Sequence, residues 1–564
     1  MGQGGAVSDA VSSAVSSAVS DAVSDAVPGP VSGASITRRT LLAAASAAAA
    51  GCTPHAQAPT PMAWVGASHE RGHRLRSNAA LPLPAVQRRA QVLVLGGGIA
   101  GLAAARGFLR QGVQDVHLLE LEDSPGGNSR GHVLAGMVCP LGAHYLPVPN
   151  ERGPAHEVAE WLYEIGLLKH ELGRTVADER HLCHSPQERL FIEGAWSEGL
   201  LPPVDPGSAA AQQMQRFSQT VATLRRTGAT HGKPAFALPA HRSAWGPVQA
   251  DLDKLTFAHW LDAQGFTDPY LRWYLNYCCR DDFGADAASV SAWAGVHYFA
   301  SRHGFHAPGE VDAERDGVFT WPEGNAWLVQ RLAAPLAQGG AGRIHTAQTV
   351  LRVTENRHGV QVLAWNESAA QLEAWSAAQV VLALPLFVAA QVLESPPQAL
   401  KDAAALLRYA PWLVANLHLT EPLLARPGAP PSWDNVIYGS TGLGYVDALH
   451  QSLRPVPGAT VLTAYRALPH SERAALLASD PHAAGQSVLT DLHAAHPDIH
   501  RRVQQVDLMR WGHAMAIAQP GLQRHAALMA LRAQRGRVRF AHADLAGCSV
   551  FEEAFTAGCE AAGA

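Results

Sequence analysis

Residues 91–120 read QVLVLGGGIAGLAAARGFLRQGVQDVHLLE, and this stretch decides the fold. It opens on a short continuous apolar run, which is typical of a buried parallel strand. Three glycines follow, and the apolar segment 102–110 predicts a helix. A second apolar run over 116–119 ends in Glu120. The order of strand, glycine turn, helix and strand predicts the first unit of a doubly wound α/β fold.

Each glycine of the turn is explained by a steric requirement of the strand–turn–helix unit. Gly96 permits the tight strand-to-helix turn, Gly98 lets the backbone approach a pyrophosphate, and Gly101 lets the helix pack close to the strand. The helix start supplies free N–H groups and a positive dipole end for phosphates. Glu120 lies nineteen residues after Gly101, where a carboxylate bonds ribose hydroxyls. The dinucleotide-contacting residues predicted from this stretch are Gly96, Gly98, Ile99, Ala100, Gly101 and Glu120.

Residues 120–130, ELEDSPGGNSR, resemble the flavin-containing amine oxidase and phytoene desaturase superfamily. Its motif places a Gly-Gly pair six residues after the ribose glutamate, usually followed by arginine. Here Asn128 follows Gly127 and Arg130 comes two residues later, which leaves open which side chain contacts the phosphates or the flavin edge. Gly142, Ala143 and His144 match the family's next segment, which passes the isoalloxazine. The resemblance implies FAD as the cofactor.

The C-terminal stretch 537–558, RVRFAHADLAGCSVFEEAFTAG, is similar to the closing motif of the same superfamily. The resemblance implies that Asp544 bonds the ribityl or pyrophosphate region and that Val550 begins a helix whose N-terminus faces the flavin O2 edge. That dipole would favour the anionic reduced flavin. His542 stands where the family usually has glycine. Between the two ends, Val350 matches a valine whose backbone reads the adenine edge.

Because the cofactor segments are dispersed, we expect an α/β protein: a doubly wound FAD-binding domain interrupted by a mixed α+β substrate domain. The expected FAD-binding segments are 89–150, 319–394 and 506–564. The expected substrate-domain segments are 151–318 and 395–505. Residues 53–88 have no clear period and are expected to be a linker.

The first 52 residues are interpreted as a low-complexity stretch followed by a targeting signal. Valine recurs every four residues over 6–27 among Ser and Ala, and whether residues 1–30 are translated stays open. Arg38 and Arg39 precede an uncharged Ala-rich run, which resembles a twin-arginine export signal. The sequence ending in Cys52 resembles a lipoprotein cleavage box. We therefore expect export to the periplasm, with membrane attachment through a lipidated Cys52 as an open question.

Composition excludes several classes of protein. The residues are 47% hydrophobic and 16% charged, which rules out wholesale disorder. A formal net charge of −5 speaks against a nucleic-acid partner. The sequence contains no run of eighteen uncharged apolar residues, which excludes a polytopic membrane protein. No metal is expected, because His297, His303 and His306 lack a carboxylate or cysteine to complete a set.

The substrate side is less determined. Candidate pocket residues, by their position relative to family motifs, are Trp511, His513, Asn325 and Tyr445; no catalytic residue is assigned. The scaffold permits hydride removal from a small-molecule substrate, with an amine such as a polyamine as the first hypothesis. The alternatives are a desaturase or isomerase acting on a lipid-like or polyene substrate, and a flavin-binding lipoprotein without a substrate of its own.

The electron acceptor also stays open. Many amine oxidases have a lysine that bonds a water near flavin N5. The four lysines of this chain are Lys169, Lys233, Lys254 and Lys401, and none stands in a matching context. Oxygen, a quinone and a redox protein are therefore all retained as acceptors.

Overall fold

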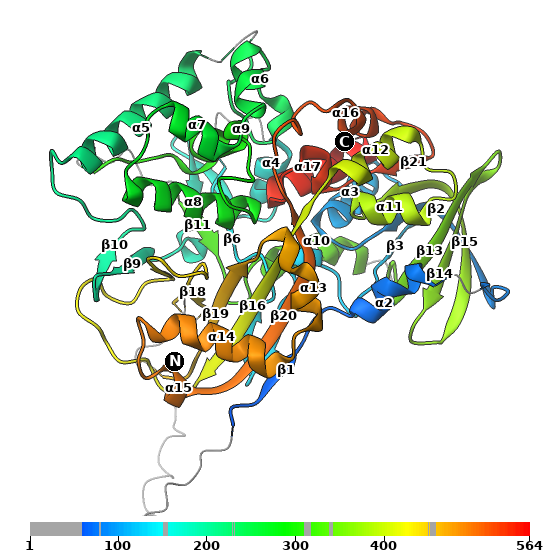
Figure 1. Ribbon diagram of the computed structural model, residues 1–564. Coiled ribbons are helices and arrows are strands. Elements are labelled where there is room, and N and C mark those ends of the chain that lie inside the picture. Colours follow the sequence, from blue (N-terminus) through cyan, green and yellow to red (C-terminus); the bar gives the residue numbers. More distant parts are fainter. Residues whose placement is uncertain are drawn as a thin grey trace, which may run out of the picture. The chain divides into compact units, whose positions relative to one another are not determined.

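The computed structural model describes residues 59–77, 80–149, 156–227, 229, 232–308, 317–337, 342–448, 450–451 and 458–563 (Figure 1). The description concerns the unit from Thr60 to Ala564. The low-complexity repeat, the arginine pair and Cys52 lie outside the described residues. Within the described part, no helix has both the length and the apolar character needed to cross a bilayer.

The strand–turn–helix–strand unit predicted from residues 91–120 is present. It consists of β2 (Val86–Leu95), α3 (Ile99–Arg110) and β3 (Val116–Leu119). Strand β2 pairs in parallel with β3 on one side and with β15 (Gln371–Leu382) on the other. The short strand β21 (Val538–Phe540) pairs in parallel with β15. The two distant ends of the chain therefore join one sheet, and the predicted α/β class is confirmed.

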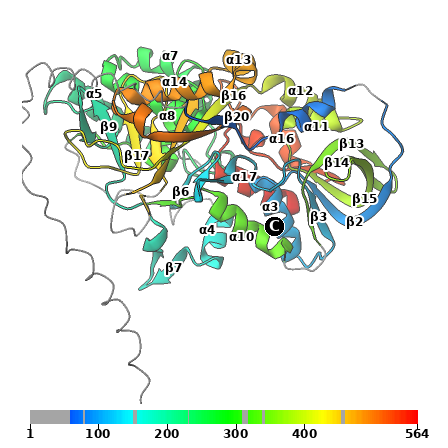
Figure 2. The same ribbon diagram turned by 90° about the horizontal axis from the view of Figure 1, so that it is seen from below.

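This first sheet has seven strands among the described residues. Its antiparallel part consists of β13 (Gln348–Asn356), β14 (Gly359–Asn366) and β15, and β12 (Ile344–His345) pairs in parallel with β3. Helices α3 and α17 (Phe551–Ala562) lie against each other, and α10 (Ala326–Ala337) also packs on α3 (Figures 1 and 2). Their buried faces share one apolar core with Phe108, Phe551 and Phe555.

The second sheet has eight strands in the order β1-β20-β16-β19-β18-β17-β9-β10, counted over the described residues. Their bounds are β1 (Met62–Trp64), β20 (Val503–Ala516), β16 (Tyr409–Leu419), β19 (Thr460–Ala467), β18 (Tyr445–Asp447), β17 (Asp434–Ile437), β9 (Glu188–Ile192) and β10 (Ala195–Glu198). Strands from four separate parts of the chain meet here, so this sheet places residues that no local motif connects.

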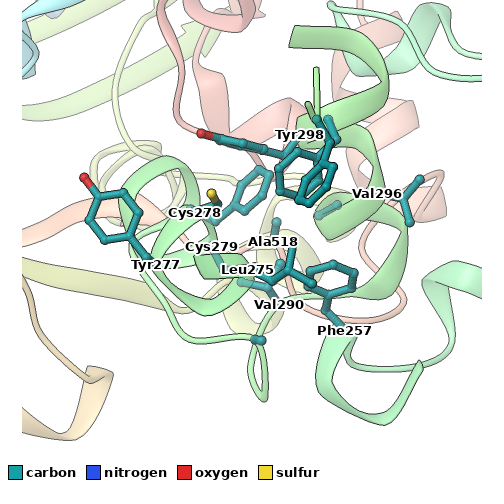
Figure 3. Close-up of a cluster of buried hydrophobic side chains, with 14 of the residues drawn as sticks. Phe257, Leu275, Tyr277, Cys278, Cys279, Val290, Val296, Tyr298 and Ala518 are labelled. Carbon is teal, nitrogen blue, oxygen red and sulfur yellow. The ribbon is translucent and has the colours of Figure 1, made fainter. Parts of the chain in front are cut away.

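A group of helices packs beside this sheet through an apolar core. They are α5 (Ala209–Thr227), α6 (Pro247–Asp253), α7 (Phe257–Ala263), α8 (Pro269–Phe283), α9 (Ala292–His297) and the π-helix η5 (Tyr298–His303). Figure 3 shows Leu275 of α8 against Phe257 and Val290, whereas the ring of Tyr277 points away from them. Helix α8 therefore carries an apolar face toward the helices and a polar-tipped face toward the sheet side.

The remaining elements connect these layers. They are α2 (His69–His73), β4 (Gly131–Leu134), β5 (Met137–Pro140), β6 (Tyr145–Pro147), α4 (His156–Glu164), β7 (Leu168–Glu171), β8 (Arg174–Ala177), β11 (Val318–Thr320), α11 (Leu386–Val392), α12 (Gln398–Leu406), α13 (Arg473–Ala478), α14 (Pro481–His493), α15 (Ile499–Arg502) and α16 (Ala526–Ala533).

The structure differs from the expected segment boundaries in three places. The expected linker 53–88 contains β1, which pairs in parallel with β20, because a free edge strand can recruit even a three-residue segment. The expected boundary at 505 falls inside β20, whose whole length belongs to the eight-stranded sheet. Helix α12, expected in the substrate domain, packs against α11 and α16. Periodicity does not reveal such partners, because they are chosen by tertiary packing.

Candidate functional site

The glycine turn between β2 and α3 is shaped by close backbone contacts. Gly96 has φ +104°, and a Cβ there would stand 2.3 Å from the Ala383 carbonyl oxygen. A Cβ on Gly101 would stand 1.9 Å from the Gly96 carbonyl oxygen. Beside Gly98, by contrast, a Cβ would meet nothing nearer than the Gly127 Cα at 3.9 Å. The protein itself thus requires glycine at 96 and 101, whereas Gly98 leaves room that a pyrophosphate can occupy.

Glu120 lies buried at the end of β3, beside this turn. Its Oε2 accepts the Gly97 N–H at 2.6 Å, and its Oε1 accepts the Glu122 N–H at 2.9 Å. Burial raises the pKa of Glu120, and these backbone bonds together with Arg130 act in the opposite direction. Both oxygens are held in place and keep lone pairs for hydroxyl donors, as a ribose partner requires.

Arg130 and Asn128 have different surroundings. The Asn128 side-chain amide donates to the Ala514 carbonyl at 2.6 Å, and the Asn128 backbone carbonyl accepts the Ala143 N–H at 2.8 Å. The buried Arg130 keeps Nε and Nη2 without a hydrogen-bond partner, and its Nη1 lies 3.8 Å from the Glu122 carboxylate. Unsatisfied buried donors are costly, so this guanidinium fits a site that an anionic group completes. Of the two residues, we propose Arg130 as the one that contacts the phosphates or the flavin edge.

Asp544 lies in the short helix η7 (Ala543–Ala546) and joins two other elements. Its Oδ2 accepts the Leu386 N–H at 2.9 Å and the Tyr409 hydroxyl at 2.6 Å. Its buried Oδ1 lies 3.1 Å from Nδ1 of His542, but that nitrogen accepts the Asp544 N–H, so Oδ1 receives no hydrogen bond among the described residues. Burial alone would raise the pKa of Asp544, but the electrostatic influence of His542 and the Tyr409 and Leu386 donors lower it overall. One oxygen is thus left for a ribityl or pyrophosphate donor.

Three further positions predicted to contact the cofactor are Val550, Val350 and Gly142. Val550 is the N-cap residue of α17 and supplies no side-chain cap, so the first N–H groups of that helix are not covered by a capping side chain. Val350 lies in β13 at a β-bulge between Val350 and Arg352. Gly142 approaches Asn128 so closely that a Cβ would stand 2.2 Å from its carbonyl oxygen. The dispersed positions predicted from sequence are thus packed around the ends of β2, β3 and α17.

The open space beside Gly98, the unpaired nitrogens of Arg130 and the unpaired oxygen of Asp544 all fit FAD. The family model for flavin-containing amine oxidoreductases matches residues 99–564. The chain belongs to this family. Its cofactor is accordingly FAD, and the family places it among the oxidoreductases. Within the described residues, no group of three His, Cys, Asp or Glu side chains is arranged to hold a metal ion.

Curated relatives match this family member over short segments. The human peroxisomal N(1)-acetyl-spermine/spermidine oxidase is 32% identical over 135 residues, 24% of this chain and 23% of that protein. The bovine protein of the same name is 37% identical over 82 residues, 14% of this chain and 15% of that protein. The chain thus aligns with less than a quarter of the length of these relatives.

Solved structures share the fold over most of the chain. Putrescine oxidase bound to putrescine is 17% identical with a TM-score of 0.60, over 85% of this chain and 99% of that one. Cyclohexylamine oxidase from Brevibacterium oxydans is 18% identical with a TM-score of 0.59, over 84% and 98%. A fatty acid isomerase from P. acnes is 15% identical with a TM-score of 0.57, over 83% and 97%. At these identities the likeness shows the fold.

Three carboxylates lie near one another on the substrate side. Asp434 of β17 and Glu188 of β9 are direct neighbours across two parallel strands. Burial, followed by Asp281 and then Glu188, raises the pKa of Asp434 well above its usual value. Burial, followed by the neighbouring Asp282, raises the pKa of Asp281 to about 7, while Arg302 and the Tyr145 hydroxyl act against this. We call Asp281, Asp434 and Glu188 the acidic cluster.

Aromatic rings lie next to this cluster. His144 stacks on Tyr465 with ring centres 4.6 Å apart and lies 5.4 Å from Trp433. Tyr145 lies 5.1 Å from His144 and donates its hydroxyl to Asp281. Burial lowers the pKa of His144 to about 4, so the ring is neutral at pH 7. We call His144, Tyr145, Trp433 and Tyr465 the aromatic group. Ring faces and carboxylates together provide a setting for a cation.

The four predicted pocket residues lie in different places. Asn325 donates to the Tyr145 carbonyl at 3.0 Å and so adjoins the aromatic group. The Trp511 indole donates to the Leu141 carbonyl at 2.7 Å, and its ring lies 5.6 Å from the Arg130 guanidinium. His513 packs against Phe387, with ring centres 4.5 Å apart.

Tyr445 bonds His496 at 2.8 Å within a separate apolar core. The structure therefore brings Asn325 to the aromatic group and Trp511 to Arg130, while Tyr445 packs elsewhere. The sequence alone favoured an ion pair or helix-end cap for Asp281 and placed Asp434 in a candidate pocket segment, but it could not show that these two and Glu188 come together.

Proposed function

We propose that this chain uses FAD to oxidise a cationic amine, a polyamine or a similar molecule with more than one ammonium group. The observation that carries the proposal is the acidic cluster beside the aromatic group. After burial itself, Asp281 and Glu188 raise the pKa of Asp434, and all three carboxylates raise that of Tyr277, which means that they gather negative charge in one region. A bound cation would relieve that repulsion. Two similar proteins, an N(1)-acetyl-spermine/spermidine oxidase and a putrescine oxidase, support the same substrate class.

The chemistry divides between the cofactor and the chain. FAD, when bound, accepts a hydride from the C–H bond next to the amine nitrogen. The acidic cluster binds the ammonium groups of the substrate and so holds its reacting C–H bond in a fixed orientation. The nitrogen beside the reacting carbon must be neutral, so it has to lie away from the acidic cluster, whose carboxylates would raise its ammonium pKa. Asp281, with its pKa near 7, can hold a proton at that end of the cluster.

The lipid-like alternative fits the acidic cluster less well. A polyene or acyl chain brings no positive charge to the acidic cluster, whereas an ammonium group would pair with its carboxylates. The carboxylates therefore favour the amine.

The test is anaerobic titration of the yellow holoenzyme with candidate substrates, in which reduction of the flavin is measured as a loss of its absorbance. We expect putrescine, spermidine or an acetylated polyamine to bleach the flavin, and an uncharged polyene not to. Asp434→Asn should raise the half-saturating concentration of a diamine about tenfold, the value of one lost charge-assisted bond of about 1.4 kcal/mol. Asp402→Asn, at an exposed position on α12, is the matched control. Bleaching by the polyene and by no amine would contradict the proposal.

Export is a second part of the proposal. It rests on Arg38 and Arg39 before the uncharged run 41–51, and on Cys52, whose lipidation would attach the protein to a membrane. Replacing both arginines with lysine should leave precursor in the cytoplasm and no mature protein in the periplasm. Normal export of that variant would exclude the twin-arginine route.

The electron acceptor can be inferred from the lysines. Lys169, Lys233, Lys254 and Lys401 are all exposed, so none of them lies in the buried site. We propose that electrons leave to a quinone or a redox protein faster than to oxygen. Stopped-flow reoxidation of the reduced enzyme by oxygen and by a soluble quinone compares the two rates, and a faster reaction with oxygen would refute the proposal.

A further inference from the structure

A cavity of about 510 Å³ lies away from the acidic cluster and the glycine turn, between α16, η7 and the C-terminal end of α17. Its volume falls in the range of small-molecule sites. Leu545 and Ala546 of η7 form part of its wall, and the same short helix carries Asp544. Three arginines, Arg524, Arg532 and Arg535, also line it.

One carboxylate lies among these arginines. His241 and Arg532 lower the pKa of Glu560 to about 2 against the effect of burial, so Glu560 is ionised at neutral pH. Its two oxygens lie 2.9 Å from His241 Nε2 and 3.0 Å from Arg532 Nη1. Arg532 Nη1 also lies 3.0 Å from His241 Nδ1, which can accept its proton while Nε2 donates to Glu560. Glu560 is therefore fully used, yet Arg532 keeps its buried Nη2 without a partner.

The other two arginines contact carbonyl groups. Arg524 Nη2 donates to the carbonyls of His241 and Ser243 at 2.8 and 2.9 Å. Arg535 Nη1 donates to the carbonyls of Arg532 and Gln534. In the described part of the chain, no carboxylate lies within 4.0 Å of Arg524 or Arg535. Burial and the charge of Arg532 both lower the pKa of Arg524, so these two guanidinium groups repel each other. Glu560 also lies 3.9 Å from Arg242, and the buried Glu553 feels the charge of Arg532, but Glu560 is the one carboxylate among the residues that line the cavity.

The rest of the wall is apolar. Leu522, Leu528 and Leu545 are buried along it, and the Met529 side chain is 48% exposed. A single exposed methionine needs no explanation by itself. Here, however, Met529 lies in the same cavity as three arginines and an unpaired guanidinium nitrogen. The cavity therefore has one cationic side and one apolar side.

We propose that this cavity binds a small amphipathic anion, a carboxylate or phosphate ester on a short apolar chain. The anionic group bonds Arg532 Nη2 and stands between Arg524 and Arg532, where it offsets their repulsion. The apolar chain lies against Leu522, Leu528 and Met529. The site is separate from the amine site of the proposed function and does not depend on it.

The experiment is calorimetric titration of the purified holoenzyme with octanoate, 1-octanol and inorganic phosphate. We expect octanoate to bind saturably, and octanol and phosphate to bind at least tenfold more weakly, because each lacks one half of the recognition. Arg524→Gln should weaken octanoate binding about tenfold. Arg226→Gln, at an exposed position of α5, should leave it unchanged. Should Arg524→Gln fail to fold, Met529→Glu places a repelling carboxylate at an exposed position and should weaken binding equally.

Three results would overturn the proposal: no octanoate binding at millimolar concentration, equal binding by wild type and both cavity variants, or phosphate binding as tightly as octanoate. Sedimentation with vesicles separates two sources of the same chemistry. Octanoate binding without sedimentation on phosphatidylglycerol vesicles supports a free small molecule. Sedimentation that requires Arg524 and fails on phosphatidylcholine supports an anionic lipid headgroup.

Discussion

At Gly558 of α17 the C-terminal segment lies directly against α3, and replacing this glycine by alanine tests the cofactor site as a whole. A Cβ there would stand 2.2 Å from the Ala100 carbonyl oxygen and 2.8 Å from the Ala103 Cβ. An ordinary contact needs about 3.4 Å, so α17 must move roughly 1 Å away from α3. Overpacking of this kind typically costs about 1–3 kcal/mol.

The displacement should appear in FAD binding. The start of α3 is the expected pyrophosphate contact and the start of α17 the expected flavin contact, so moving one helix misplaces one end of the cofactor relative to the other. We expect FAD affinity to fall at least tenfold, about 1.4 kcal/mol, and the melting temperature to fall by a few degrees. Titration of apoprotein with FAD, followed by quenching of flavin fluorescence, measures the first quantity, and thermal unfolding measures the second.

Gly72→Ala is the matched control. Gly72 lies on α2, where a Cβ would meet nothing within 4 Å. The same Gly-to-Ala change there should alter neither FAD affinity nor melting. If Gly558→Ala bound FAD within twofold of Gly72→Ala and melted within about 1 °C of it, the reasoning that α3 and α17 jointly hold the cofactor would be refuted.

Three further predictions concern charged groups. In the wild type, the inhibition constant of benzyltrimethylammonium, a cation that does not titrate, should fall about tenfold from pH 6 to pH 8, because a carboxyl with a pKa of about 7 ionises in this range. Asp281→Asn should abolish this pH dependence. A flat wild-type profile would contradict the prediction. Asp253→Asn should stabilise the protein at pH 8. Burial raises the folded-state pKa of Asp253 to about 7, so the folded state binds the proton more tightly than the unfolded state, and the free energy of unfolding falls by up to about 4 kcal/mol as pH rises from about 4 to 7. Urea unfolding at pH 5 and pH 8 checks it, and equal pH dependence in variant and wild type would disprove it. Arg130→Met should weaken FAD binding about tenfold or more, while the exposed Arg226→Met should not; unchanged FAD affinity in Arg130→Met would exclude Arg130 from the cofactor site.

The cofactor half of the molecule could be read from the chain because its signals are local. A glycine turn needs Gly96 and Gly101 at fixed spacing, since backbone atoms approach within contact distance there, and the ribose carboxylate must end the following strand. The sequence could not choose between Asn128 and Arg130. Our proposal of Arg130 rests on two tertiary observations, the Asn128 amide bonded to the carbonyl of Ala514, nearly four hundred residues away, and the unpaired nitrogens of Arg130.

The substrate half was decided by tertiary structure. Asp281 is followed directly by Asp282 in the sequence, but only the pairing of β17 with β9 and the packing of α8 bring it near Asp434 and Glu188. The expected linker likewise became strand β1 once β20 offered it an edge. Local patterns carry information about backbone geometry within a few turns of chain. Charge crowding arises between segments far apart in the sequence, so it exists only after the chain has folded.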